Sequence, residues 1–517
     1  MNKSIKKLSK KNKSLSYIPI RYILAILLTL LETAIIVAIV ILLTIYIPYF
    51  YIAVLLTQLG VVLAIFSSDD NPDYKLPWLL FVLILPVAGF MLYFLFYRRK
   101  LSKKYIKKLK WSKNLEIIEN NKAKEKLRQE EDSLTYSSIK QLCTISNSHV
   151  YMNTKIEYFK LGDLVLPRML EDLEKAEKFI FIEYFIISEG YFWNEILNII
   201  LKKVNEGVDV KVIYDDIGCM MTLPGNYCNN LRRLGIDCVI FSPLRGQADS
   251  EFNNRSHRKI MSIDNKVAYT GGINIADEYI NKIVKHGKWK DVAIRLEGDA
   301  VSEMTKLFIM DYNLNSKKII VHSERLLQSH KSQNDGYVVP FGDGPFPIYK
   351  RRVGKSVIMN MLNQAKNYVY ITSPYLIIDD ELTQTIENCA LRGIDVRIVT
   401  PHVPDKKIIL SMTRSSYKRL IESGVKIYEY KPGFIHSKVY LSDDSIAMVG
   451  TINLDYRSLV HHFENGVYMY KCSVIQSIKK DLLDTMDQSI FINEHLLYEN
   501  ILTKILRSFV KVFSSLL

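Results

Sequence analysis

Two short segments of the sequence carry the same side chains in the same order: a histidine and a lysine two residues apart, then an aspartate, a glycine and an asparagine. The first contains His257-Arg258-Lys259, Asp264, Gly271, Gly272 and Asn274, and the second contains His436-Ser437-Lys438, Asp443, Gly450, Thr451 and Asn453. Both fit the pattern H-x-K-x4-D-x6-G-[GT]-x-N. One short motif carries a real risk of chance occurrence, but two extended copies favour a shared chemical role.

The residue types in these segments suit displacement at a phosphodiester. That reaction needs a nucleophile, an acid for the departing oxygen, and positively charged or hydrogen-bond-donating groups around the phosphoryl oxygens. A neutral imidazole from one segment can attack phosphorus while the imidazolium of the other protonates the leaving oxygen. Histidine and lysine at positions i and i+2 of a strand project from one face, so both can approach one ligand. We therefore expect one active site that is built from both segments and requires no metal or other cofactor.

The candidate site residues divide by expected role. The catalytic group is His257, Lys259, Asp264, His436, Lys438 and Asp443, and the phosphate-stabilising group is Asn274 and Asn453. Within the catalytic group, the two aspartates fall in the hairpin-turn sequences DNK and DDS, so we expect them to brace the turns rather than to reach substrate. Glycines after each turn let the next strand approach closely, and the asparagine amide can then point back into the site.

The elements that position these residues repeat along the chain. Short runs rich in β-branched and aromatic residues alternate with helical stretches, which predicts an α/β fold with helices covering a sheet. The run FIFIEYFII at 179–187 is matched by NYVYITSPYLII at 367–378, and NEGVDVKVIYD is matched by LRGIDVRIVTP at 391–401. An internal duplication explains this repeat. We predict two similar α/β lobes, with the ligand bound at their interface.

The expected domain boundaries follow from composition. An apolar amino-terminal region predicts an α-helical membrane anchor, and a segment rich in Glu, Lys and Asn with a helical apolar rhythm connects it to the first lobe. Gly, Asp, Ser and Pro accumulate between the lobes in SHKSQNDGYVVPFGDGP, which is typical of a linker. The predicted units are the anchor at 1–110, a helical linker at 111–144, the first lobe at 145–328, an interlobe linker at 329–345 and the second lobe at 346–517.

The anchor contains two apolar tracts, each longer than the roughly 20 residues that span a bilayer. Between Tyr22 and Phe66 the only charged side chain is Glu32, and residues 76–97 carry none. The first tract is too long and too bulky for a cleavable signal peptide, so we expect a permanent anchor. Lysines crowd the amino end, and a second basic cluster follows the anchor at Arg98, Arg99, Lys100, Lys103, Lys104, Lys107, Lys108 and Lys110. Both clusters predict a multi-pass protein of the cell membrane with its lobes on the cytoplasmic side.

The number of crossings depends on the segment between the two tracts. Asp69, Asp70 and Asp73 outnumber Lys75 there, which favours the outside face and requires one net crossing in the first tract. That tract is long enough for two spans broken at Pro48, but two spans would place the lobes outside. We therefore expect one net crossing, with the remainder re-entrant or interfacial.

Net charge limits the class of partner, and cysteine usage indicates the compartment. The formal charge of +15 favours a polyanion, either nucleic acid or the anionic face of a membrane, and the anchor favours the membrane. The six cysteines include no C-x-x-C pair, which indicates a reducing compartment and no structural metal. His461 and His462 lack further ligands at suitable spacing, so a surface or pocket-wall pair is a better interpretation than a metal site. The apolar residues 501–517 suit either a membrane-surface helix or a packed final helix.

From about residue 145 onward, the motifs and their surroundings resemble the paired signatures of the phospholipase D superfamily. Closer similarity to bacterial cardiolipin synthases lies in N-x-R-x-H-R-K at 253–259, GGINIADEY at 271–279, WKD at 289–291 and GTINLDYRS at 450–458. The apolar LPWLLFVLILPVAGFMLYFLFYRRK resembles that family's membrane segment. The resemblance implies two phospholipase D-like lobes and a ping-pong transfer through a phosphohistidine. One phosphatidylglycerol releases glycerol, and a second accepts the phosphatidyl group to give cardiolipin.

The resemblance also implies roles for individual residues. The family usually assigns the nucleophile to the first motif, so His257 attacks and His436 acts as acid and then as base. An acidic residue beyond each motif orients the histidine of the opposite motif, and by position these are Glu464 for His257 and Asp291 for His436. Cardiolipin synthases commonly read N-F-E where this chain has His462-Phe463-Glu464. The orienting glutamate is kept, while its neighbour departs from the family pattern.

Three alternative functions stay open at this point. A phospholipase D that hydrolyses lipids to phosphatidic acid would use the same motifs. A nucleic-acid phosphodiesterase would suit the positive charge but not the permanent anchor, and a non-catalytic membrane scaffold would not need intact motifs. The expected partners are phosphatidylglycerol and anionic membrane lipids, without nucleic acid, and the sequence does not indicate an oligomeric state.

Overall fold

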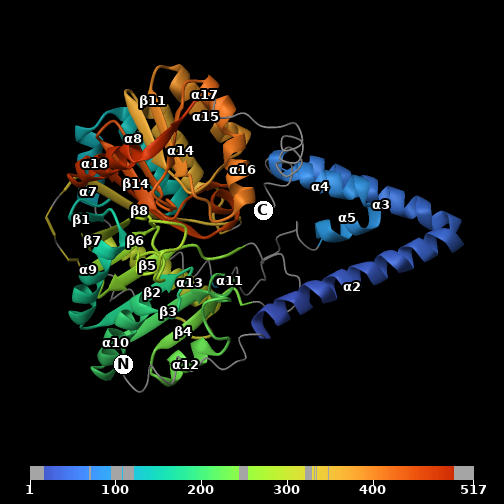
Figure 1. Ribbon diagram of the computed structural model, residues 1–517, viewed down its shortest axis with the longest axis horizontal. Coiled ribbons are helices and arrows are strands. Elements are labelled where there is room, and N and C mark those ends of the chain that lie inside the picture. Colours follow the sequence, from blue (N-terminus) through green and yellow to red (C-terminus); the bar gives the residue numbers. More distant parts are fainter. Residues whose placement is uncertain are drawn as a thin grey trace.

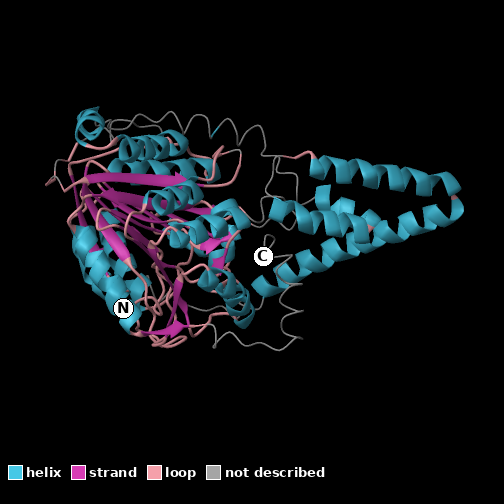
Figure 2. Ribbon diagram, turned by 90° about the horizontal axis from the view of Figure 1, so that it is seen from above, coloured by secondary structure: helices cyan, strands magenta, loops and turns pink. Residues whose placement is uncertain are grey.

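The computed structural model describes residues 17–68, 72–94, 121–243, 254–320, 335–346 and 348–493, with position 108 and the short stretches 329–330 and 332–333. Two α/β lobes lie side by side, and a group of apolar helices projects from them (Figure 1, Figure 2). Some features of the sequence lie outside the described residues, namely most of the two basic clusters, Asp69, Asp70 and the segment 501–517.

The first lobe is built on a seven-stranded mixed sheet with the strand order β1-β7-β6-β5-β2-β3-β4. Its strands are β1 (Thr154–Phe159), β2 (Phe179–Tyr184), β3 (Asp209–Asp215), β4 (Asp237–Phe241), β5 (Lys259–Ile263), β6 (Val267–Gly271) and β7 (Ala293–Gly298). Its helices are α9 (Gly162–Glu174), α10 (Tyr191–Asn205), α11 (Asp216–Cys219), α12 (Tyr227–Arg233) and α13 (Val301–Asn315). Strand β2 is buried along its whole length and pairs in parallel with β3, which explains its continuous apolar run.

The second lobe repeats this sheet. The strand order β8-β16-β14-β13-β9-β11-β12 matches the first sheet strand for strand, with β17 added at the edge, and this match confirms the predicted duplication. Its strands are β8 (Tyr337–Asp343), β9 (Tyr368–Thr372), β11 (Asp395–Pro401), β12 (Lys426–Tyr430), β13 (Val439–Ser442), β14 (Ile446–Gly450), β16 (Glu464–Tyr470) and β17 (Ser489–Ile492), with a small pair β10 (Leu376–Ile377) and β15 (Leu454–Asp455). Its helices are α14 (Val353–Gln364), α15 (Asp380–Leu391), α16 (Lys407–Ser415), α17 (Tyr417–Glu422), η3 (Arg457–His461) and α18 (Val474–Asp487).

Helix α13 joins the two lobes. Nearly every residue of this helix is buried, and it contacts β2, β5 and β6 of the first sheet as well as β8 of the second. A single hydrophobic cluster therefore includes residues of both lobes, such as Phe308 and Val339. Because the lobes share a core, the hairpins β5–β6 and β13–β14, which carry the two motifs, are held in a defined relation to each other.

The local structure of the two predicted linkers differs from the expectation. Residues Tyr337–Asp343 of the expected interlobe linker form β8, a buried strand at the edge of the second sheet. Pro340 is tolerated there because an edge strand leaves one side of its backbone outside the ladder. The expected solvated connecting helix is instead a pair, α7 (Asn121–Glu130) and α8 (Ser133–Ser146), and α8 buries Ile139 and Leu142 in the core next to β8.

The amino-terminal apolar region folds as two helical hairpins (Figure 2). Helices α2 (Tyr17–Tyr46) and α3 (Pro48–Phe66) form the longer one, and α4 (Pro72–Ile84) and α5 (Pro86–Leu92) form the shorter one. Pro48 and Pro86 each begin a helix, where the missing N–H of proline is tolerated. By length and composition, one described helix, Tyr49–Phe66, could cross a membrane, and Leu27–Leu43 and Tyr74–Ile84 are shorter apolar helices.

The start of α4 lies against the second lobe. The ring of Tyr74 is 5.6 Å from that of His461, centroid to centroid, and a cavity of about 480 Å³ is lined by residues of α4 and of this lobe. The start of α4 therefore lies on the side of the lobes, while the number of crossings and the sidedness stay predictions. A break at Leu85 divides the second apolar tract into two short helices.

Candidate active site

The two motifs meet at the interface between the lobes, because each is hydrogen-bonded to a segment of the opposite lobe. The backbone N–H of His257, just before β5, donates to the carbonyl of Phe463 at 2.8 Å. In the equivalent place of the second motif, the backbone N–H of His436 donates to the carbonyl of Lys290 at 2.8 Å. Isolated β-bridges extend both contacts. The backbone thus carries each histidine to the segment that leads into β16 or β7 of the other sheet.

Each motif histidine is braced by a carboxylate from the opposite lobe. Nδ1 of His257 lies 2.9 Å from Oε2 of Glu464, and Nδ1 of His436 lies 2.7 Å from Oδ2 of Asp291. Both carboxylates are fully buried and both histidines nearly so. A carboxylate that accepts the Nδ1 proton fixes the tautomer and leaves Nε2 to face a substrate. The structure therefore contains both contacts that were expected from position.

The electrostatics of the first pair favour a neutral imidazole beside an ionised carboxylate. Burial lowers the pKa of His257 to about 3, with Lys259 acting in the same direction and Glu464 against it. Burial opposes ionisation of Glu464, but the adjacent His257 and His462 together hold the pKa of this carboxyl below its usual range. At neutral pH the Nε2 of His257 is therefore unprotonated, which is the form that a nucleophile requires.

In the second pair, His436 and Asp291, the carboxylate has a raised pKa instead of a lowered one. Burial lowers the pKa of His436 well below its usual value, and the charges of Lys438 and Lys259 lower it further. Burial raises the pKa of Asp291 to about 7, although Lys438 and the backbone N–H of Val292 oppose the shift. The pair can therefore take up or release a proton near neutral pH, which suits general acid–base chemistry.

The motif lysines are buried at the same interface. Burial lowers the pKa of Lys259 to about 7, and the nearby Lys438 contributes in the same direction. Burial also lowers the pKa of Lys438 to about 8. Nζ of Lys259 donates to the carbonyl of His257 at 2.8 Å, and Nζ of Lys438 lies 2.8 Å from Nδ1 of His436. Because the lysine of one motif acts on the groups of the other, both half-sites belong to one electrostatic environment, and a bound anion raises both lysine pKa values.

The motif aspartates brace turns, as their hairpin-turn sequences predict. Each carboxylate accepts hydrogen bonds from three successive backbone N–H groups at the start of a neighbouring strand: Glu177, Lys178 and Phe179 for Asp264, and Lys366, Asn367 and Tyr368 for Asp443. Both aspartates have a positive φ, 54° and 51°, which aspartate tolerates in tight turns. They anchor the motif hairpins to β2 and β9.

The two motif asparagines differ in their surroundings. Oδ1 of Asn274 accepts from the backbone N–H of Ile186 at 3.1 Å, and its Nδ2 donates to the hydroxyl of Tyr279 at 2.8 Å. Asn453 is buried, and its Oδ1 has no hydrogen-bond partner within the described part of the chain. An amide oxygen only accepts hydrogen bonds, so a phosphoryl oxygen would have to bind the Nδ2 of Asn453. The phosphate-stabilising role of both asparagines stays a prediction.

Known families match both lobes. The family model described as "Cardiolipin synthase, PLD-like domain" matches residues 169–308 and 358–485, and a phospholipase D-nuclease N-terminal model matches residues 55–98. The chain belongs to this phospholipase D-like cardiolipin synthase family. The matched ranges contain both motifs and both bracing carboxylates.

Similar proteins agree with this membership. An uncharacterized protein of Streptococcus mutans is 41% identical over 89% of this chain and 100% of its own length. A cardiolipin synthase of Alkalihalophilus pseudofirmus is 33% identical over 83% of this chain and 86% of its own length. Phosphatidylserine synthase of Haemophilus influenzae, at 17% identity, has the same fold with a TM-score of 0.55 over 74% of this chain and 100% of that structure. The cardiolipin synthase relatives favour a phosphatidyltransferase over a lipid hydrolase.

Three further residues, to which the motif pattern gives no role, complete the surroundings of this cardiolipin synthase-type site. The hydroxyls of Thr451 and Ser458 donate to the carboxylate of Glu464, the latter at 2.7 Å. Arg258, the variable residue inside the first motif, is fully buried, pairs with Asp311 at 2.7 Å and donates to the carbonyl of Glu464 at 3.1 Å. The side chains are visible in the sequence, but only the fold brings all three to Glu464.

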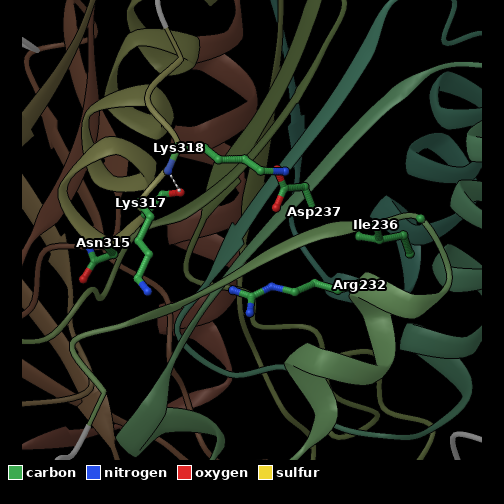
Figure 3. A pocket seen from close by; sticks show the side chains of 8 residues that line it. Arg232, Ile236, Asp237, Asn315, Lys317 and Lys318 are labelled. Atoms are coloured by element: carbon green, nitrogen blue, oxygen red, sulfur yellow. Dashed lines mark hydrogen bonds and ion pairs between the residues drawn. The ribbon is translucent and has the colours of Figure 1, made fainter.

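A cavity of about 580 Å³ lies away from this cluster, at the edge of the first lobe (Figure 3). It is lined by Arg232, Gly235, Ile236, Asp237, Asn315, Ser316, Lys317 and Lys318. Its lining comes from α12, β4 and the end of α13 and contains no motif residue. The candidate reaction centre of this family member is therefore the interlobe cluster and not this cavity.

Proposed function

We propose that this protein is a cardiolipin synthase that transfers a phosphatidyl group from one phosphatidylglycerol to another through a phosphohistidine, giving cardiolipin and glycerol. The observation that carries the proposal is the cross-bracing of the histidines, where His257 pairs with Glu464 and His436 with Asp291. A two-step displacement needs a neutral nucleophile and a group that gives and takes a proton, and the two histidine–carboxylate pairs differ in this way. The names of the curated relatives from Alkalihalophilus and Halalkalibacterium support the same reaction.

In the first step, Nε2 of neutral His257 attacks phosphorus, a P–N bond forms, and the bond between phosphorus and the glycerol oxygen breaks. The Nδ1 proton stays on the ring and faces Glu464, which stabilises the positive charge that develops there. The departing oxygen takes its proton from His436, whose imidazolium form is favoured once the anionic substrate is bound. Glycerol then leaves, and the phosphatidyl group remains on His257.

In the second step, the hydroxyl of another phosphatidylglycerol gives its proton to His436 and attacks phosphorus. The P–N bond breaks, cardiolipin forms, and His257 returns to its neutral state. Lys259, Lys438 and Asn453 hold the phosphoryl oxygens through both steps. Water competes for the same intermediate and would give phosphatidic acid, so the lipid hydroxyl must be well positioned and the intermediate shielded.

Membrane embedding keeps this chemistry at a lipid surface. Helices α2 and α3 expose many large apolar side chains, among them Leu56 and Leu63, as helices in hydrocarbon do. Since the hairpin returns to the lobes, the proposed arrangement is a multi-pass anchor with the amino terminus and both lobes on the cytoplasmic side. Phosphatidylglycerol and other anionic lipids of that leaflet are the proposed partners.

The test is product identification with the full chain reconstituted in phosphatidylglycerol vesicles. Cardiolipin and glycerol should form in equal amounts, and His257→Ala should form neither. His149→Asn is the matched control, because His149 forms a similar histidine–carboxylate pair with Glu303 at 2.7 Å outside the motif cluster, and this variant should retain activity. Phosphatidic acid as the main product, without cardiolipin, would overturn the transferase in favour of a hydrolase.

A further inference from the structure

His462 lies beside the proposed nucleophile, and the transfer steps do not use it. Its ring centroid is 5.6 Å from that of His257, and its Nδ1 is 3.7 Å from Oε1 of Glu464, which is longer than a hydrogen bond. This Nδ1 is buried without a hydrogen-bond partner among the residues that the structure describes. A buried imidazole nitrogen in that condition invites a ligand.

We propose that His257, His462 and Glu464 bind a divalent transition metal ion, Zn²⁺ before others, and that the bound ion stops phosphatidyl transfer. Donor atoms of the three residues all lie within 4.8 Å of one another. Two imidazoles and one carboxylate form a zinc ligand set that leaves a fourth position for water. Mg²⁺ and Ca²⁺ prefer sites made of oxygen ligands and are disfavoured here. The inhibitory part rests on the proposed function, whereas metal binding does not.

The distances suit a tetrahedral ion. Two ligands that are each about 2.0–2.1 Å from zinc lie roughly 3.3 Å apart in a tetrahedral site. Oε1 of Glu464 lies 3.0 Å from Nδ1 of His257 and 3.7 Å from Nδ1 of His462, and these two separations bracket that value. Small rotations of the two rings seat the ion. Thr451 and Ser458 already hold the carboxylate by hydrogen bonds, as outer-shell partners of a metal site do.

The ion takes the place of the proton that His257 shares with Glu464, and this proton leaves to solvent. Coordination occupies the carboxylate that would stabilise the imidazolium, and it withdraws electron density from the ring of His257. Nε2 becomes a weaker nucleophile, so the phosphohistidine does not form. Within the described ranges this is the single group of three such donors, so the ion acts on the first half-site and not on the second.

Metal binding is measured on the chelator-treated full chain in nanodiscs, with Co²⁺ as the spectroscopic probe. One Co²⁺ per chain should give the visible absorption of a tetrahedral site, and Zn²⁺ should displace it. His462→Asn should weaken binding by at least about 10-fold, since the loss of an outer-shell partner alone weakens metal sites by roughly 10- to 100-fold. His149→Asn should leave the affinity unchanged. X-ray absorption of the zinc-loaded wild type, which needs no variant, should show two imidazoles bound to the ion.

Inhibition is measured on phosphatidylglycerol vesicles, with each rate divided by that of the same protein in chelator. Zn²⁺ should inhibit wild type and His149→Asn at the same concentration, and His462→Asn only at a concentration at least about 10-fold higher. Equal zinc affinity in wild type and His462→Asn overturns the proposal, as does activation by Zn²⁺ or a zinc shell without two imidazoles. Co²⁺ binding that requires His462 in a protein that makes no cardiolipin would refute the proposed function and uphold the metal site.

Discussion

The two half-sites share a motif but differ in the carboxylate that braces each histidine. The pKa of Glu464, beside His257, is held below its usual range, whereas burial raises the pKa of Asp291, beside His436, to about 7. A brace that stays charged suits a ring that must keep one tautomer and carry the phosphatidyl group. A brace that titrates near neutrality suits a ring that gives a proton in one step and takes one in the next. Duplication supplies two histidines, and their surroundings separate their tasks.

The position written [GT] in the motif pattern, Gly272 in one copy and Thr451 in the other, also differs between the two half-sites. A Cβ atom at Gly272 would lie 2.0 Å from Oδ1 of Asp291, so the first copy has room only for glycine there. The second copy has Thr451 in this place, and its hydroxyl donates to Glu464. Each motif thus contributes to a brace, in one copy by leaving space for a carboxylate and in the other by donating a hydrogen bond to one.

Replacement of the motif histidines one at a time should give the largest difference in activity between the two half-sites. His257→Ala should lower cardiolipin formation by at least about 10⁴-fold, because no nucleophile remains. His436→Ala should be impaired with phosphatidylglycerol but much less with a phosphatidyl ester of a nitrophenol, whose leaving group needs no acid. Intact-mass spectrometry after a neutral denaturing quench should find a phosphatidyl adduct on His436→Ala and none on His257→Ala. The opposite pattern would exchange the two assignments.

The bracing carboxylates should differ in their pH dependence. Glu464→Gln should lower turnover by at least about 100-fold, because an amide can hold the ring in the wrong tautomer. Deprotonation of Asp291 should lower wild-type turnover as the pH rises through about 7, since the pair then lacks the proton for the leaving group. Asp291→Asn should lose this part of the profile. The charge of Asp291 raises the pKa of Lys259 and Lys438, so Asp291→Asn also moves their titration to lower pH, and a decline that only moves to lower pH is assigned to the lysines. An identical decline in both would contradict the assignment.

Much of the fold and of the site could be predicted because the informative patterns are local and occur twice. The apolar runs predicted as strands are β2 and β9, which are buried along their whole length, and strands buried on both faces read as continuous hydrophobic segments. The spacing of His257 and Lys259 places both side chains on one face of a strand. The positions of Glu464 and Asp291 were expected from the family resemblance, and both lie beside the expected histidines.

The features that could not be predicted depend on contacts between distant segments. The residues Tyr337–Asp343 look like a linker because of Pro340 and their glycine and aspartate content, yet β16 and α8 bury them as a strand. His462 looked like a surface or pocket-wall residue without partners, because its neighbour in space, His257, comes from the other half of the chain. The difference between Asn274 and Asn453 likewise depends on Tyr279, which one copy supplies to its asparagine.

The buried lysines should make the affinity for a phosphate analogue depend on pH. Tungstate is a useful probe because it stays a dianion while the protein titrates. In the empty site the pKa is about 7 for Lys259 and about 8 for Lys438, so above these values binding must take up protons and weakens by roughly 10-fold per pH unit for each proton. Calorimetry on the full chain should show the decline begin near pH 7 in wild type and nearer pH 8 in Lys259→Met. A flat profile in wild type would show that the anion does not contact the lysines.

Replacement of Thr451 should give the smallest loss of turnover among these variants, and it tests whether the second motif supports the carboxylate that braces His257. Thr451→Val keeps the size of the side chain but removes the hydroxyl that donates to Glu464. A hydrogen bond to a charged group contributes about 1.5–3 kcal/mol, and Ser458 still donates in the variant, so turnover should fall by about 10-fold. Thr451→Ser keeps the donor and should stay within about twofold of wild type.

The hydroxyl of Thr451 also accepts from the backbone N–H of Asn465 at 3.0 Å and lies 3.1 Å from its carbonyl oxygen, so a purely structural role must be separated from an effect on His257. Thermal unfolding and turnover at saturating phosphatidylglycerol are therefore measured together on Thr451→Val and Thr451→Ser. If Thr451→Val lowers the melting temperature and leaves kcat unchanged, the hydroxyl supports only the packing of β14 against β16. If kcat falls while Thr451→Ser restores it, the second motif acts through Glu464 on the nucleophile of the first.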